Sequence, residues 1–160
     1  MTKQTKIGKV QTKKITGILA GVSGEYFVAA ELSRRGIISS VTLKNTKGID
    51  ILVANETATR IIGIQVKTNQ NDRKAWVLNS KAEDFFADNL FYIFVNLIDN
   101  KQLPEYYIVP SKDVADAVKT GHKEWLETPG KKGQKHNDSK MRMFADDKQI
   151  YRDKWDTLKL

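Results

Sequence analysis

The segment Arg60–Thr68, which reads RIIGIQVKT, restricts the folds open to this chain more than any other segment. Successive side chains of a β-strand point to opposite faces of a sheet, so its apolar residues at positions 62, 64 and 66 would share one face. Gln65 and Lys67 would lie on the other face. A polar pair is costly to bury unless another group satisfies it. The pattern therefore predicts a core strand with one apolar face and one face that carries chemistry.

The rest of the chain alternates between helix and strand patterns, which predicts a mixed α/β domain around one sheet. The expected core order is α-β-β-β-α-β, and two turn-linked strands in a row favour a meander. The continuous apolar run Leu90–Ile98 is typical of a central strand. The predicted elements are a helix over 21–36 that Ser23 caps, strands over 39–44, 49–54, 60–68, 76–78, 90–98 and 105–109, helices over 80–87, 110–120 and 148–158, and a loop over 121–142.

The composition fits one globular domain and excludes several classes of site. The chain has 160 residues, of which 40% are hydrophobic, so it can bury one core. It has no cysteine, which excludes disulfides, iron–sulfur clusters and cysteine nucleophiles. Its 2 histidines lie far apart in the sequence, which disfavours a histidine-rich metal site. No stretch approaches the ~20 apolar residues of a membrane helix, so we expect a cytoplasmic protein.

The formal net charge of +8 is concentrated in two segments. Residues 1–14 hold five lysines and no acid, residues 119–142 hold 7 basic and 3 acidic residues, and residues 15–118 hold 11 basic and 12 acidic residues. Such patches attract nucleic acid, although basic tails also serve simply to keep proteins in solution. We expect a flexible basic arm over 1–14 and a single domain over 15–160. The lysines expected to bind nucleic acid are Lys3, Lys6, Lys9, Lys13, Lys14, Lys131, Lys132 and Lys135.

Two acidic residues are expected near the polar pair of segment 60–68. Asp50 begins the preceding strand, so it would lie beside Gln65 and Lys67 if the two strands are antiparallel neighbours. Glu25 lies on the upstream helix. Hard oxygen ligands bind Mg²⁺, which polarises a phosphate and lowers the pKa of a bound water. A lysine beside the metal can stabilise the charge that develops on the phosphate.

These residues resemble the motifs of the PD-(D/E)XK nuclease superfamily. The similarity covers roughly residues 17–110, and its motifs are the helix 23–36 with a Gly-Glu pair, Gly48–Asp50, and the Q-V-K-T run Gln65–Thr68. The resemblance implies a single restriction-endonuclease-like domain with a mixed central sheet flanked by helices. It also implies a metal-dependent DNA endonuclease that uses Mg²⁺ or Mn²⁺. Since nucleases that cut both strands often dimerise, a homodimer is compatible with this resemblance.

The resemblance also implies a role for each motif residue. Asp50 would be the principal metal ligand, and Gln65 and the carbonyl group of Val66 would be further ligands. Lys67 would be the catalytic lysine, and Glu25 would support the site or bind a second metal. The chain departs from the family pattern in two places, because Ile49 replaces a proline and Gln65 replaces the usual Asp or Glu. An amide oxygen still ligates, but the metal affinity should fall.

Each of these residues also has an interpretation without chemistry. The helix dipole favours Glu25 in a first helical turn whatever its function. Asp50 could be a turn residue, and Gln65 and Lys67 could face solvent on an edge strand. Two other functions therefore remain open at this stage. One is a nuclease fold that binds nucleic acid without cutting it, and the other is a small accessory protein that binds other proteins.

Overall fold

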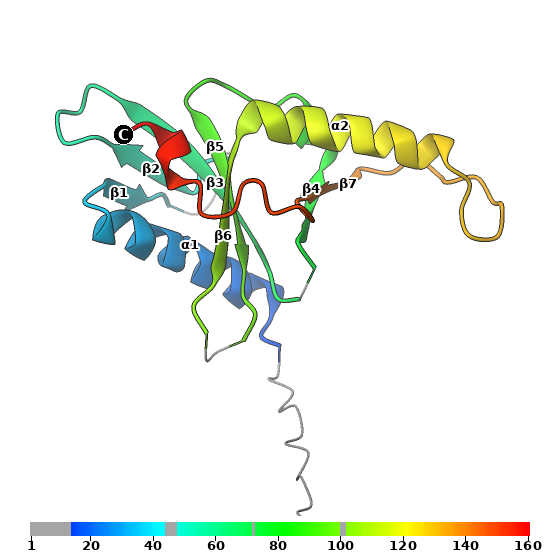
Figure 1. The fold of residues 1–160 in the computed structure, drawn as a ribbon, viewed down its shortest axis with the longest axis horizontal. Coiled ribbons are helices and arrows are strands. Elements are labelled where there is room, and N and C mark those ends of the chain that lie inside the picture. Colours follow the sequence, from blue (N-terminus) through cyan, green and yellow to red (C-terminus); the bar gives the residue numbers. More distant parts are fainter. Residues whose placement is uncertain (1–13, 44–47, 72, 100–101) are drawn as a thin grey trace, which may run out of the picture.

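The computed structural model describes residues 14–43, 48–71, 73–99 and 102–160. They form a mixed α/β arrangement in which two helices enclose a central sheet (Figure 1). The prediction of this fold class is confirmed. The elements are α1 (Gly17–Arg34), β1 (Ile38–Val41), β2 (Ile51–Ala54), β3 (Ile61–Asn69), β4 (Ala75–Asn79), η1 (Ser80–Glu83), β5 (Leu90–Asn96), β6 (Glu105–Pro110), α2 (Ser111–Glu127), β7 (Met141–Ala145) and η2 (Trp155–Leu158).

The central sheet has the strand order β1-β2-β3-β5-β6. Strands β1, β2 and β3 are antiparallel neighbours, which confirms the predicted meander. Strand β3 pairs with β5 in parallel, and β5 pairs with β6 antiparallel. The predicted motif strand β3 therefore lies at the centre of the sheet, between an antiparallel and a parallel neighbour. Strands β4 and β7 form a separate two-stranded ribbon.

Each face of the central sheet has its own core. On one face, α1 packs against the apolar residues of β2, β3 and β5, including Ile64 and Val66, and η2 closes the same layer. On the other face, α2 and the β4–β7 ribbon pack against aromatic residues of β5 and β6, including Tyr92 and Phe94. Figure 1 shows α1 and α2 on opposite sides of the sheet. Trp76 belongs to the second core, where its indole Nε1 donates to the carbonyl oxygen of Val95 at 2.9 Å.

The structure corrects the predicted start of α1. Ser23 lies inside the helix rather than at its start. Thr16 is the N-cap, and its hydroxyl oxygen accepts a hydrogen bond from the amide nitrogen of Leu19 at 3.3 Å. The helix begins at Gly17, earlier than predicted, and includes Gly21 in its first turns. A cap by Thr16 satisfies one of the amide groups that every helix start leaves unpaired.

The segment after α2 is also more regular than predicted. Helix α2 continues through Gly121 to Glu127 instead of stopping near Thr120, and β7 occupies the end of the predicted loop 121–142. The predicted helix 148–158 is wrong. Gln149 and Asp153 adopt positive φ angles, which a regular right-handed helix does not permit, and only the short 3₁₀ turn η2 forms there.

The element between β3 and β5 differs from the predicted helix over 80–87. The chain forms strand β4 and then a single 3₁₀ turn, capped by the side chain of Asn79 rather than by Ser80.

Of the predicted basic arm, residues 1–13 with Lys3, Lys6, Lys9 and Lys13 lie outside the described residues, and Lys14 is exposed. In the described part of the chain, no helix is both long enough and apolar enough to cross a membrane.

Candidate active site

The register of β2 and β3 places Asp50 beside Gln65. Ile51 pairs with Ile64, so Asp50, one residue earlier, lies opposite Gln65. The amide nitrogen of Asp50 donates to the carbonyl oxygen of Ile64 at 2.8 Å. In addition, the carboxylate oxygen Oδ2 of Asp50 accepts a hydrogen bond from the amide nitrogen of Val66 at 2.7 Å. The Asp50 carboxylate is therefore fixed against the backbone of the motif strand, between Gln65 and Lys67.

Lys67 lies on the same face of β3 as Gln65, two residues further along the strand. Both side chains are half-buried, whereas Ile64 and Val66 on the opposite face are buried. Across the parallel pair, Gln65 lies beside Tyr92 and Lys67 lies beside Phe94. The predicted alternation of β3 is thus confirmed, and the antiparallel arrangement that was expected to bring Asp50 to the polar pair is present.

Tyr92 adds a polar group to this row that the sequence did not single out. Burial raises the pKa of the Tyr92 phenol to about 12, and the negative charge of Asp50 contributes to the same shift. The phenol therefore stays protonated at neutral pH and is available as a hydrogen-bond donor beside the carboxylate. Asp50, which directly precedes β2, forms one row with Gln65 on β3 and Tyr92 on β5.

The turn that leads into Asp50 is held from two sides. The Thr42 hydroxyl donates to the carbonyl oxygen of Ile49 at 2.7 Å, and the amide nitrogen of Thr42 donates to the carbonyl oxygen of Asp50 at 2.9 Å. Gly48 has a φ of 70°, and a Cβ atom there would lie 2.5 Å from the ring of Phe85. Only glycine satisfies both conditions. This packing of Gly48 under Phe85 was not predictable, because the two residues are distant in sequence.

Glu25 approaches this region from the other side of the sheet. It lies on α1, which packs on the face opposite Gln65 and Lys67. Its neighbour Gly24 contacts Thr68, the residue that follows Lys67, so α1 passes the end of the motif strand. The structure therefore brings Asp50, Gln65 and Lys67 together on one face, and it places Glu25 on the helix that crosses the end of β3.

The oxygen donors of this site match the preferences of Mg²⁺ or Mn²⁺ only in part. Among the described residues, no group of three or more His, Cys, Asp or Glu side chains is arranged to hold a metal ion. The candidate donors are instead one fixed carboxylate from Asp50, the amide oxygen of Gln65 and the carbonyl group of Val66. Mg²⁺ often keeps several waters and is held by one or two carboxylates plus the phosphates of a substrate. A donor set of this size fits that mode of binding.

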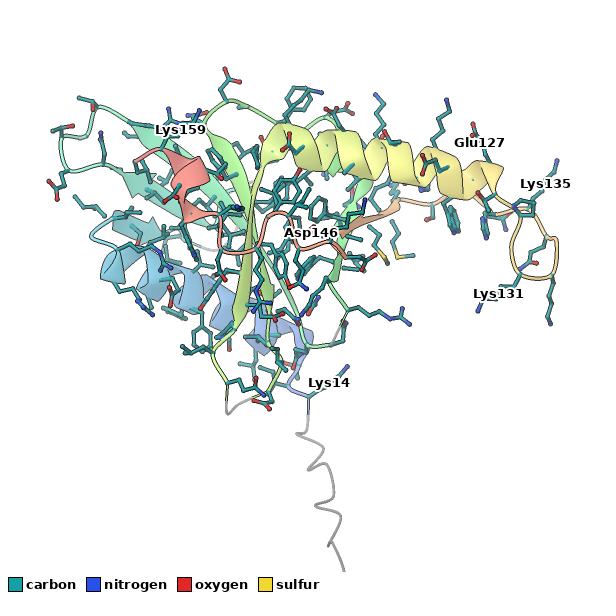
Figure 2. All side chains as sticks on the ribbon, in the orientation of Figure 1. Lys14, Glu127, Lys131, Lys135, Asp146 and Lys159 are labelled. Carbon is teal, nitrogen blue, oxygen red and sulfur yellow. The ribbon has the colours of Figure 1, made fainter. Side chains whose placement is uncertain are left out.

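Three of the predicted DNA-binding lysines lie far from the sheet, on the loop that follows α2. Figure 2 shows Lys131 and Lys135 at the tip of this loop, which extends beyond the end of the helix. His136 ties the loop to α2, because its ring stacks on Trp125 at 4.0 Å between centroids and its Nδ1 lies 2.6 Å from the carbonyl oxygen of Trp125. Lys131, Lys132 and Lys135 are all exposed.

A second contact ties the same loop to α2. His122 Nε2 lies 2.8 Å from a carboxylate oxygen of Asp138, and this hydrogen bond lowers the pKa of the Asp138 carboxyl group. The loop is therefore attached to the helix by two histidines at different points. Sequence reasoning missed the role of both histidines, since their partners depend on how the loop folds back.

Comparison with known proteins identifies the fold. No protein-family model matches the chain, and no curated protein matches it. The solved structure of a bacterial homing endonuclease, I-Ssp6803I, is similar, with a TM-score of 0.52, 13% sequence identity, and coverage of 91% of this chain and 94% of that chain. A Holliday junction resolvase from Archaeoglobus fulgidus, Hjc, matches with a TM-score of 0.44, 14% identity, and coverage of 82% of this chain and 86% of that chain. The chain has a restriction-endonuclease-like fold.

Proposed function

We propose that this protein is a metal-dependent nuclease that hydrolyses phosphodiester bonds in DNA. The observation that carries the proposal is the position of Asp50, whose carboxylate is fixed on the backbone of β3 between Gln65 and Lys67. An acid and a lysine held on one rigid sheet match the requirements of phosphoryl chemistry, in which most catalysis is positioning and charge stabilisation. The likeness of the fold to that of a homing endonuclease supports the same class of reaction.

Each residue of the row has a distinct task in this proposal. Asp50, the amide oxygen of Gln65 and the carbonyl oxygen of Val66 hold Mg²⁺ or Mn²⁺, and Glu25 supports the site from α1. The bound metal supplies Lewis-acid polarisation of the phosphate and a water of lowered pKa. Lys67 contacts a phosphate oxygen, where its compact positive charge stabilises the transition state more than the ground state. These tasks need no movement of the sheet, since Gln65, Val66 and Lys67 belong to β3 and the Asp50 carboxylate is held by the amide nitrogen of Val66.

The basic segments contribute affinity for the DNA backbone. The lysines of the loop after α2, together with those of residues 1–14, neutralise phosphates without reading sequence. Binding of this kind weakens steeply as salt rises, and each phosphate contact adds about 0.9 to the slope of log K against log salt. Removing residues 1–14 should therefore lower the salt slope while leaving the fold intact.

A second function has a specific observation in its favour. Gln65 stands where the PD-(D/E)XK motif carries a carboxylate, and a unit charge at about 4 Å is worth roughly 4 kcal/mol at an effective dielectric near 20. Loss of that charge weakens metal binding. The alternative is therefore a nuclease-fold protein that binds nucleic acid and does not cleave it.

Cleavage assays on matched variants test the proposal. The chain would be incubated with Mg²⁺ or Mn²⁺ and with supercoiled, single-stranded and branched DNA, and compared with Asp50→Asn and Lys67→Met. Each variant should lose about 10²–10³-fold in rate, the usual effect of removing one group that stabilises a transition state. Lys154→Met, on an exposed residue away from the row, is the control and should retain full activity.

The outcomes separate the two functions. Gln65→Glu restores a carboxylate, so it should lower the metal concentration needed for half-maximal cleavage. Activity that survives both Asp50→Asn and Lys67→Met would contradict the site. DNA binding by the wild-type chain, with no cleavage of any substrate until Gln65 becomes glutamate, would select the non-cutting alternative.

A further inference from the structure

Helix α1 is apolar on two opposite sides. Its inner side, with Val28 and Leu32, packs in the core on one face of the sheet. Its outer side carries a stripe of apolar residues at the spacing of one helical face, and the largest of them are strongly exposed: 76% for Ile18, 55% for Leu19 and 65% for Tyr26. Surface helices normally carry polar residues on the outer side, whereas helices that are apolar all round are normally covered. We name this outer stripe the α1 stripe; its residues are Ile18, Leu19, Val22, Tyr26 and Ala30.

Charged residues are absent from the α1 stripe. The charged residues of α1 are Glu25, Glu31 and Arg34, and two of them border the stripe: Glu25 lies three residues after Val22, and Arg34 lies four residues after Ala30. Glu31 is buried and pairs with Arg34 and Arg35, so it does not serve the outer side of the helix. The outer surface of α2 is different, since Lys112 and Asp116 form an exposed ion pair there. Because the stripe residues themselves carry no positive charge, the stripe favours an apolar occupant over a polyanion.

The size of the stripe suits a dimer interface. Together with the flanking Ile15 and Phe27, it exposes roughly 550 Å² of large apolar side chains, taking about 200 Å² for one fully exposed large side chain. This area lies at the upper end of the range for the largest apolar patch of an ordinary monomer, about 300–600 Å², and patches of that size are often functional. Homodimer interfaces are about 65% apolar in area, so this patch corresponds to an interface near 850 Å² per chain. Stable interfaces bury about 800 Å² per partner.

The order of residues along the stripe makes it complementary to itself. Two large side chains, Leu19 and Tyr26, lie at equal distances along the helix from a midpoint at Val22 and Ser23, whose side chains are smaller. Two copies of α1 packed antiparallel about this midpoint place Leu19 of each copy against Tyr26 of the other. Such an arrangement is isologous, as the interfaces of closed two-fold dimers are.

We propose that the chain forms a two-fold homodimer through antiparallel packing of the α1 stripe of two copies. The contact lies on the face of the sheet opposite Gln65 and Lys67, so both rows of the candidate active site stay accessible in the dimer. The proposal rests on the outer side of α1 alone. It holds whether or not the protein cleaves DNA.

The mass of the full-length chain in solution tests the proposal. Sedimentation velocity and light scattering should give a mass near twice 18.2 kDa at micromolar concentrations. Leu19→Arg and Tyr26→Glu should each raise the dimer dissociation constant about 30-fold or more, as expected for truncation or charge at a central anchor. Met143→Arg, which places the same charge on an apolar residue with 54% exposure on β7, is the matched control and should leave the dimer intact.

Mixing the two variants tests the antiparallel register directly. In a mixed dimer, the arginine introduced by Leu19→Arg in one copy faces the glutamate introduced by Tyr26→Glu in the other, while the second contact is still Leu19 against Tyr26. The mixture should therefore recover the dimeric mass that each variant loses alone, and circular dichroism should confirm that both variants are folded. A monomeric wild-type chain at about 100 μM, a concentration at which a stable interface of this size is occupied, would overturn the proposal. Dissociation by Met143→Arg would overturn it as well, and so would a mixture that stays monomeric.

Discussion

The two faces of strand β3 differ in what they give to the protein. On the α1 face, Ile62, Ile64 and Val66 are buried in a continuous apolar core. On the other face, Gln65 and Lys67 are half-buried beside a carboxylate and a phenol. Alternate residues of one strand thus have different roles: those on the α1 face stabilise the fold, and those on the other face belong to the proposed active site. The rigid apolar face holds the backbone still, and a fixed backbone positions the polar face.

The second face is itself divided along its length. The aromatic residues of β5 and β6 are covered by α2 and by the β4–β7 ribbon, with Phe94 stacked on Phe144 at 4.5 Å between ring centroids. The part around Gln65 is only half-buried. The comparison predicts that substitutions on the α1 face change stability and that substitutions around Gln65 change activity. Three experiments test the contacts on which this difference depends.

The largest effect is expected from Ile64→Ala. This side chain is buried between α1 and the sheet, so its truncation should cost about 2–5 kcal/mol in the free energy of unfolding. Gln65→Ala, the adjacent residue on the other face, should cost under about 1 kcal/mol because its side chain is half-buried. Urea denaturation of both variants measures the difference. Equal losses for the two variants would contradict the division between the faces.

A smaller effect is expected where α1 touches β3. A Cβ atom on Gly24 would lie 1.9 Å from the Thr68 hydroxyl oxygen, so Gly24→Ala should destabilise the chain by about 1–3 kcal/mol. Gly21→Ala is the matched control, since nothing lies within 4 Å of a Cβ there, and it should stabilise by about 0.4–1 kcal/mol. Adding Thr68→Ala to Gly24→Ala removes the clashing atom and should recover most of the loss. Without such recovery in thermal melts, the close helix–strand contact would be wrong.

The smallest effect concerns the phenol of Tyr92. Its pKa is raised to about 12 from an ordinary value near 10, so the protonated form stabilises the fold. This contribution is fully present below about pH 10 and is lost as the pH rises towards 12. Asp50→Asn removes the nearby negative charge, so it should lower the pKa of Tyr92, which an ultraviolet tyrosinate titration against Tyr92→Phe can resolve. An unchanged pKa in Asp50→Asn would place the carboxylate away from Tyr92.

The sequence predicted the centre of the sheet better than its surroundings. The positions of Asp50 and Gln65 follow from the two-residue period of a strand and from a short connection between antiparallel neighbours, both of which are local. Strand β7 was missed because it contains a buried charged residue, Arg142, which is satisfied by Glu83, a partner 59 residues away. Helix α2 was predicted too short because the segment from Gly121 onwards was assigned to a loop, yet this glycine lies in the helix interior without steric contact.

Other parts of the site depended on tertiary packing that no local pattern records. Tyr92 was assigned only to a central strand, and its place beside Gln65 requires the parallel pairing of β3 with β5. Glu25 lies on α1, which packs on the other face of the sheet, so its place relative to Asp50 depends on how this helix crosses the end of β3. The chain between Lys148 and Leu158 was predicted helical from its apolar spacing. The carboxylate of Asp146 instead binds the amide groups of Ile150 and Tyr151, which fixes a turn.

The hydrogen bond from the Val66 amide to Asp50 has an evolutionary consequence. Val66 is buried, so a substitution that removed the carboxylate would leave its amide without that acceptor and would lower stability as well as activity. Lys67 is half-buried, and its role in the proposed site is to stabilise charge on the phosphate rather than to satisfy a buried amide group. In a lineage released from selection for cleavage, drift would therefore remove Lys67 before Asp50. An intact aspartate at this position is then a weaker indicator of a working enzyme than an intact lysine two residues after Gln65.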